Sequence, residues 1–323
     1  MRFGILFGAL LVVGCNSAPI QTYTVEFPSL TVDPGVEKTQ CVVLNLHNTT
    51  EIHVGQIHNT LSEASHHMIV YRVNDTVEQP APFDCEPFVD TLDPTKGAPL
   101  MITQKKEDLL DLPAGVAYTL QPNQMVRLEM HYINATMQPL TLGGSSTMIT
   151  SHTFHDEANF LFIGNPDIKI PPNSTFTLGP TFFKLDQDTF GGANFFAFTG
   201  HEHRFGTNVT VQAATAAGDT SGPMVYDVPN WVWSEPATVF HDPPVEIPTS
   251  GGGFNFTCDW DNTSDQQVKF GESANNEMCF FWAYYYPSKG AYVCMHTTQA
   301  GGHDFCCPGA VECAFIAQAA GGM

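Results

Sequence analysis

Hydrophobic and polar residues alternate in short runs along most of the chain, and clusters of Pro, Gly, Asn, Asp and Thr separate these runs. The runs are rich in β-branched and aromatic residues, as in QTYTVEFPSLTV, MVRLEMHYI and MCFFWAYYYP. This pattern is typical of half-buried β-strands, and many short strands with turn signals between them indicate β-sandwiches. The pattern therefore predicts an all-β protein made of antiparallel sheets.

Two stretches depart from this alternation. Residues 105–112 combine charged residues with leucines and end at Pro113, a pattern that predicts one short helix. The Gly-rich stretch at residues 250–253 predicts a hairpin loop or a short linker.

The series of strands breaks between Thr150 and Glu157. The hairpin QPLTLGGSSTMIT completes one series, and NFLFIG begins a second. We therefore expect two tandem antiparallel β-sandwich domains of the jelly-roll kind, over residues 21–153 and 156–290. A Cys-rich tail follows at residues 291–323.

The N-terminus has the features of an export signal. Arg2 precedes an apolar run that is too short to span a membrane and ends in Val-Val-Gly-Cys15. This ending resembles the lipobox of a bacterial lipoprotein, which predicts a signal peptide over residues 1–14 and lipidation of Cys15. An ordinary signal peptide, with Cys15 incidental, is the alternative. Either predicts an exported protein, lipid-anchored to the bacterial outer membrane or else periplasmic or extracellular.

Charge excludes one class of partner. The chain has 12 Lys and Arg against 33 Asp and Glu, a formal charge of −21. Nucleic acids and anionic membrane surfaces require a basic footprint. We therefore expect no nucleic-acid partner, and membrane contact only through the lipid anchor.

The cysteines also fit an exported protein. Apart from Cys15 there are eight, an even number that predicts disulfide bonds in an oxidising compartment. Four are well separated and four crowd the tail: Cys41, Cys85, Cys258 and Cys279, then Cys294, Cys306, Cys307 and Cys313. A bond between adjacent cysteines is strained, so Cys306 and Cys307 should have different partners if the tail cysteines pair among themselves. A tail metal site that includes His303 is the alternative, although the spacing is not that of a zinc ribbon.

Two histidines form the clearest metal-binding pattern. His201 and His203 would point to one face of a strand, because residues i and i+2 share a face, and Glu202 would point to the other. Met278 would share a face with the aromatic residues Phe280, Trp282 and Tyr284. The competing interpretation is a pair of exposed strand histidines and an ordinary core methionine.

Three further histidines form a second candidate set. His131 shares its strand face with Arg127 and Glu129, so we expect it on the wetter face of its sheet. His66 and His67 are adjacent and would point to opposite faces, unless a bulge or a strand end turns one of them. A shared site for His66, His67 and His131 therefore requires such an irregularity.

The two sets differ in donor chemistry. One offers three imidazoles, while the other offers two imidazoles and a thioether, which favours soft Cu(I). The sequence has no Gly-x-Ser-x-Gly elbow, His-Glu-x-x-His motif or phosphate-binding loop. We therefore predict two copper ions per chain, one in each domain, facing a cleft between the domains.

From about Cys41 to Cys279 the chain resembles the copper type II, ascorbate-dependent monooxygenases. Four motifs match in order and spacing: His66-His67-Met68, Met130-His131-Tyr132, His201-Glu202-His203 and Glu277-Met278-Cys279. The resemblance implies two disulfides, Cys41–Cys85 and Cys258–Cys279. It assigns the electron-donating copper to His66, His67 and His131, and the catalytic copper that meets O2 to His201, His203 and Met278. The reaction it implies is hydroxylation of a C–H bond with O2 and ascorbate or another reductant.

This chain departs from the peptide-amidating members of the family. Where they bind the substrate's carboxylate with Arg, Asn and Tyr, it has Thr199, Phe280 and Trp282, and Glu129 replaces a usual Gln. We therefore expect a neutral or apolar small molecule or peptide as substrate. A copper-handling lipoprotein without turnover, or a structural surface protein without copper, are the alternatives.

Overall fold

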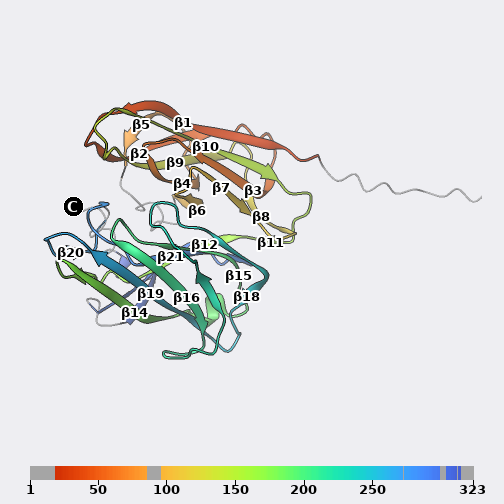
Figure 1. Cartoon of the computed structure of the whole chain (residues 1–323). Coiled ribbons are helices and arrows are strands. Elements are labelled where there is room, and N and C mark those ends of the chain that lie inside the picture. Colours follow the sequence, from red (N-terminus) through yellow and green to blue (C-terminus); the bar gives the residue numbers. More distant parts are fainter. Residues whose placement is uncertain (1–18, 86–95, 272, 299–302, 311, 314–323) are drawn as a thin grey trace, which may run out of the picture.

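The computed structural model describes residues 19–85, 96–271, 273–298, 303–310 and 312–313. Almost all regular structure in these residues is β-strand, and the helix α1 (Gln187–Phe190) is a single turn. The prediction of an all-β protein is thus confirmed. Figure 1 shows the strands as two bodies, one formed by the described residues from 22 to 157 and the other by the described residues from 159 onward.

The first half consists of two sheets packed face to face. One has the strand order β1-β10-β3-β8-β11 with β7 on β3, and the other has the order β5-β2-β9-β4-β6. The alternating apolar residues of both sheets form a core that includes Val42, Ile57, Leu128 and Leu142. The strands are β1 (Thr22–Val32), β2 (Glu37–Asn45), β3 (Ile52–Leu61), β4 (Ser65–Val73), β5 (Gln79–Asp84), β6 (Gly97–Thr103), β7 (Glu107–Asp111), β8 (Val116–Leu120), β9 (Met125–Ile133), β10 (Leu140–Thr150) and β11 (Asp156–Glu157).

The second half repeats this layered plan with a more aromatic core. Its sheets have the orders β18-β15-β21-β12-β22-β23 and β14-β19-β16-β17, and β13 pairs with β20. Phe195, Phe254, Phe281 and Trp260 pack between them. The strands are β12 (Asn159–Gly164), β13 (Lys169–Ile170), β14 (Ser174–Lys184), β15 (Asn194–His201), β16 (Gly206–Ala214), β17 (Met224–Asp227), β18 (Val239–Glu246), β19 (Gly253–Asn262), β20 (Val268–Lys269), β21 (Phe280–Tyr286), β22 (Tyr292–Thr297) and β23 (His303–Cys307).

The two halves are joined by apolar packing. The core of the first half continues into the outer faces of β12 and β21, through Phe160, Phe162, Trp282 and Tyr284. The backbone N–H of Ile102 donates to the hydroxyl of Tyr284 across this contact, at 3.2 Å. Continuous apolar packing of this kind holds the facing sheets together.

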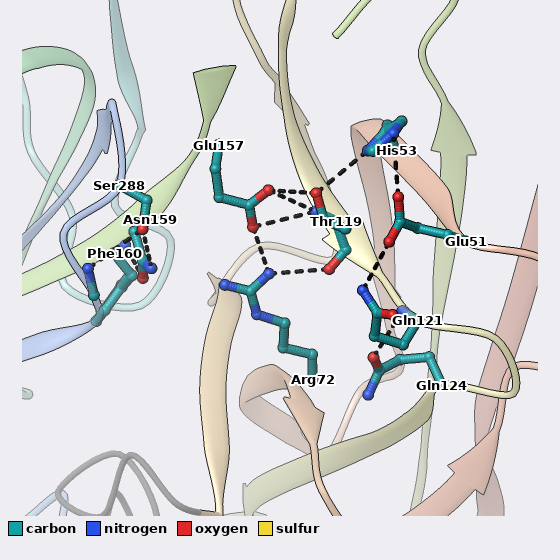
Figure 2. A network of polar contacts seen from close by, with 11 residues as sticks. Glu51, His53, Arg72, Thr119, Gln121, Gln124, Glu157, Asn159, Phe160 and Ser288 are labelled. Carbon is teal, nitrogen blue, oxygen red and sulfur yellow. Dashed lines mark hydrogen bonds and ion pairs between the residues drawn. The ribbon is translucent and has the colours of Figure 1, made fainter. Parts of the chain in front are cut away.

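A polar network secures the point where the chain passes between the halves (Figure 2). The carboxylate of Glu157 accepts bonds from Arg72 and from the backbone N–H and hydroxyl of Thr119. Two residues later, Asn159 donates to the hydroxyl of Ser288 at 2.8 Å. Because Arg72 and Thr119 lie on strands of the first half, the start of the second half is fixed against it.

Four disulfides cross-link the described residues: Cys41–Cys85, Cys258–Cys279, Cys294–Cys306 and Cys307–Cys313. The adjacent Cys306 and Cys307 have different partners, as predicted, because successive residues of β23 point to opposite faces. Since all four tail cysteines are bonded, the tail offers no thiolate to a metal ion. Disulfide-rich chains are typical of oxidising compartments.

The short helix predicted at residues 105–112 is wrong. That stretch forms β7, which pairs with β3, and its Asp108 and Leu110 are buried while Glu107, Leu109 and Asp111 are exposed. The period is therefore two, and pairing with an open strand edge outweighed local helix preference.

The predicted signal peptide and Cys15 lie outside the described residues. No helix in the described part of the chain has the length and hydropathy needed to cross a membrane.

Candidate metal centre

Three histidines of the first half converge on the outer face of one sheet, the face turned toward the second half. β4 and β9 are antiparallel neighbours, and their register places His67 opposite His131. The register shifts between Ser65 and His67, so a bulge turns His66 toward the same side, as a shared site requires. The ring centroid of His66 lies 5.4 Å from that of His67 and 5.3 Å from that of His131.

The nitrogen atoms of this set are spaced for one metal ion. The three residues can each offer one ring nitrogen such that all lie within 4.8 Å of one another. The Nδ1 atoms of His66 and His67 are 3.2 Å apart. Two nitrogens bound to one ion at about 2.0 Å, with tetrahedral or trigonal angles, are separated by roughly 3.3–3.5 Å. The residues present therefore fit a bound ion.

A carboxylate orients the third imidazole. Glu37 accepts a hydrogen bond from Nε2 of His131 at 3.2 Å. This leaves Nδ1 of His131 unprotonated and available to bind a metal ion. This hydrogen bond is the main reason that the pKa of Glu37 falls to about 2. Burial and, to a smaller extent, the neighbouring imidazoles lower the pKa of His66 to about 3 and that of His67 well below its usual value. These rings are therefore neutral, the form that binds metal ions.

His201 and His203 of the second half also lie together, with ring centroids 5.1 Å apart. β15 ends at His201, so His203 lies in the following turn and not on the strand expected from the sequence. Nδ1 of His203 is 3.1 Å from the carbonyl oxygen of Asn276, and Nδ1 of His201 is 3.0 Å from Oε1 of Gln104. Because both oxygens accept hydrogen bonds, each Nδ1 carries the proton. Each Nε2 is therefore unprotonated and available to bind a metal ion.

The segment that carries Met278 is clamped to His203. The carboxylate of Glu277 accepts from the backbone N–H of His203 and of Phe205, both at 2.8 Å, and from Nε1 of Trp260 at 2.9 Å. Burial raises the pKa of Glu277 to about 7 against the lowering effect of these bonds. Met278 is buried on the face shared with Phe280, Trp282 and Tyr284. Two imidazoles and a thioether on adjoining segments suit copper.

Glu202 points away from the two rings beside it. It is fully buried next to Gly206, where a Cβ atom would come 2.3 Å from its Oε2. Burial raises the pKa of Glu202 well above the usual range, and the nearby Glu277 raises it further. Glu202 is thus a buried acid behind the site and not a third ligand on its face.

The two histidine sets meet where the halves pack together. The rings of His66 and His203 are 6.5 Å apart, and Trp233 of the second half lies 5.6 Å from His66. All five histidines are buried, with at most 8% of any of them exposed. The expected wetter face for His131 is therefore wrong: Arg127 and Glu129 on that face are also buried, because the face is turned toward the second half.

The three residues expected around the substrate differ in their surroundings. Trp282 lies next to the site, with its ring 5.9 Å from that of His201. Phe280 stacks on Phe162 at 4.8 Å, and the hydroxyl of Thr199 bonds to that of Thr238 at 2.9 Å. All three expected residues are buried.

Comparison with known families agrees with this geometry. Residues 157–303 match the family model of the copper type II ascorbate-dependent monooxygenase C-terminal domain. These residues belong to that family. The matched range contains His201, His203 and Met278, so the copper monooxygenase assignment falls on the half that holds the two-imidazole and thioether set.

Other comparisons add little to this copper monooxygenase domain. No curated protein matches the chain. The major capsid protein P2 of bacteriophage PM2 is similar over 84% of this chain and 100% of its own, at 11% identity and a TM-score of 0.36. PNGase F, a glycosylasparaginase from Flavobacterium meningosepticum, is similar over 83% of this chain and 97% of its own, at 10% identity and the same TM-score. At these values neither likeness bears on function.

Sequence reasoning did not identify the residues that orient the ligands. Glu37, Gln104 and Glu277 contact the histidines or the chain beside them, yet no sequence pattern assigns an orienting role to any of them, and Glu277 enters only as a member of the motif Glu277-Met278-Cys279. The only local signal was the position of Glu277 beside Met278, since Glu37 and Gln104 are distant in sequence from the histidines they contact.

Proposed function

We propose that the protein is a two-copper monooxygenase that hydroxylates a C–H bond of a neutral or apolar small molecule or peptide. One observation carries the proposal: a buried set of three imidazoles in the first half faces the His-x-His turn of a copper monooxygenase domain. Copper bound at such donors supplies one-electron chemistry with O2. The overall reaction consumes the C–H substrate, O2, two electrons and two protons, and yields the hydroxylated product and water.

His66, His67 and His131 would hold the copper that stores and passes on an electron. Their burial keeps all three away from bulk water, and the neutral state of His66 and His67 keeps their donor nitrogens available. A set of three imidazoles contains no sulfur donor, so it suits both copper oxidation states more evenly than the second set does.

His201, His203 and Met278 would hold the copper at which O2 and substrate meet. The carbonyl of Asn276 and the amide of Gln104 keep the Nε2 atoms of the two rings free. Glu277 holds the backbone beside His203, which fixes the segment that presents the thioether of Met278.

The chemistry near this second set favours an apolar substrate group. Trp282 lies against His201, and Phe280 and Phe162 continue the aromatic surface. Thr199 is committed to Thr238 and provides no positive charge for a carboxylate. Efficient amidation of glycine-extended peptides by this protein would contradict the proposal.

The proposed setting is outside the cytoplasm. The four disulfides are typical of an exported protein, and the lipobox-like ending at Cys15 would add a lipid anchor. Ascorbate or another one-electron donor would supply the electrons.

The first test is the copper content of the purified protein by elemental analysis, for wild type and for His201→Ala. We expect two ions per chain in wild type and one in the variant. Ascorbate-dependent O2 uptake, stimulated by a substrate, then separates the monooxygenase from a copper-handling protein, which would bind both ions without turnover. One ion or none in wild type would contradict the two-site proposal.

A further inference from the structure

Two side chains of the first half reach across the contact between the halves and touch the metal-binding segments. Glu37 begins β2, and one carboxylate oxygen lies 3.2 Å from Nε2 of His131. The same oxygen accepts from the backbone N–H of Ala274 at 3.1 Å, and the other accepts from the hydroxyl of Ser273 at 3.3 Å. Glu37 thus contacts the first histidine set and a loop of the second half.

That loop leads directly to the second set. Ala274 is two residues before Asn276, whose carbonyl oxygen orients His203, and four residues before Met278. A continuous path of contacts therefore runs from His131 through Glu37 and Ala274 to His203. Anchoring the loop at Glu37 restricts where the carbonyl of Asn276 and the thioether of Met278 can lie.

Gln104 makes the complementary contact. It follows β6 in the first half, it is 5% exposed, and its Oε1 lies 3.0 Å from Nδ1 of His201 in the second half. Its Nε2 has no hydrogen-bond partner within the described residues. A buried amide with one unpaired end is costly, so the retained bond to His201 is the contact that accounts for its place here.

We propose that Glu37 and Gln104 are positioning residues that make the geometry of both histidine sets depend on the packing of the two halves. The inference rests on the proposed copper function. Glu37 orients His131 directly and positions the second set through the loop at Ser273 and Ala274. Gln104 orients only His201. Partners of this kind orient imidazole ligands, and their loss typically lowers metal affinity by about 10–100-fold.

The test is Cu(I) affinity, measured anaerobically on the full chain by competition with a chromophoric chelator such as bicinchoninate. The first site is titrated in a His201→Ala background and the second in a His67→Ala background. We expect Glu37→Ala to weaken both sites by about 10–100-fold and Gln104→Ala to weaken the second site alone by a similar factor. Glu37→Gln and Gln104→Glu keep an acceptor oxygen and should recover most of each loss.

A matched control excludes a general effect of removing a carboxylate from a histidine. Glu107 contacts His58 at 3.0 Å on the exposed side of the same half, so Glu107→Ala should leave both affinities unchanged. The Cu(II) EPR hyperfine splitting of the first site should change in Glu37→Ala and not in this control.

The outcomes are distinct. Wild-type affinities in both alanine variants would overturn the inference while leaving the copper function intact. Loss at the first site alone in Glu37→Ala would overturn the link through the loop. Absence of copper from wild-type protein would overturn both the inference and the proposed function.

Discussion

The two histidine sets are built in different ways. The first lies on two adjacent strands of one sheet, and strand pairing with a single bulge is enough to bring its three rings together. The second combines a strand end, a turn, the segment at residues 276–278 and a side chain from the other half. A ladder of backbone bonds brings the first set together and Glu37 orients one of its rings, whereas the second set is assembled by side-chain contacts.

This difference suggests a division of work. Strands in the interior of a sheet, such as β4 and β9, resist displacement, which suits a site that only exchanges electrons. Turns and segments between strands are the usual places for residues that contact a substrate, because they tolerate adjustment without loss of the fold. The following experiments test whether the two sets are separable.

The largest effect is expected from Met278→Leu. Leu nearly conserves the volume, so the cost in folding stability should stay below about 1.5 kcal/mol, while the thioether is lost. We expect hydroxylation to be abolished and the first copper to be retained, as read by O2 uptake and by copper X-ray absorption, where the sulfur contribution disappears. Met295→Leu, at a buried position of the same half, is the control; full activity in Met278→Leu would exclude the role assigned to the sulfur.

The second prediction concerns His67→Ala, which removes a ligand from the first set. It removes one of three imidazoles and should reduce the copper content from two ions to one, with the second site still able to bind. Multiple turnover should fall by more than the roughly 100-fold that loss of an outer partner costs. Undiminished turnover with ascorbate would show that the first set does not deliver electrons.

Removing one disulfide at a time tests how the stability of each half affects copper binding. Cys258→Ser with Cys279→Ser should lower the free energy of unfolding by about 2–5 kcal/mol and also weaken the second copper, because Cys279 follows Met278. The corresponding pair of changes at Cys41 and Cys85 should have a similar cost in stability and leave the second copper bound. Urea unfolding and copper titration measure the two effects; equal copper loss in both double variants would contradict this separation.

Acid should destabilise the metal-free protein. The folded-state pKa values of His66 and His203 are lowered to about 3 and about 4, and those of His67 and His201 are also lowered, mainly by burial. The unfolded chain therefore binds more protons below about pH 6.5, and each imidazole contributes a loss of up to about 1.4 kcal/mol per pH unit as the pH falls toward 4.

Three buried carboxyls act in the opposite direction. The raised pKa values of Asp108, Glu202 and Glu277 reduce stability as the pH rises above about 4, but four imidazoles outnumber three carboxyls. Urea unfolding at pH 5 and pH 6.5 should therefore show lower stability at pH 5. His66→Gln should reduce the difference, and no difference in wild type would mean that these rings are accessible to protons.

The sequence was informative wherever a local period determined the structure. Alternation predicted the sheets, and the requirement for an irregularity at His66 and His67 anticipated the register shift at Ser65. The same reasoning failed at residues 105–112. The leucines and charged residues there resembled a helical pattern, but the segment pairs with the open edge of β3 as strand β7.

Features that depend on how the two halves pack together could not be predicted from the local sequence pattern. Glu37 and Gln104 belong to no motif, and their partners lie far along the chain, so only the assembled structure shows them at the histidines. The burial of His131, Arg127 and Glu129 has the same origin, because a face that is polar in sequence becomes interior when another sheet covers it.

The last described strand has a consequence for biosynthesis. Phe305 and Cys307 of β23 pack in the core that extends through the first half, while Cys306 packs against the core of the second. These residues leave the ribosome after the other described strands, so both cores are completed only once β23 has been synthesised. Because Cys306 and Cys307 must then find different partners, we expect maturation to finish only after export, where thiols are oxidised.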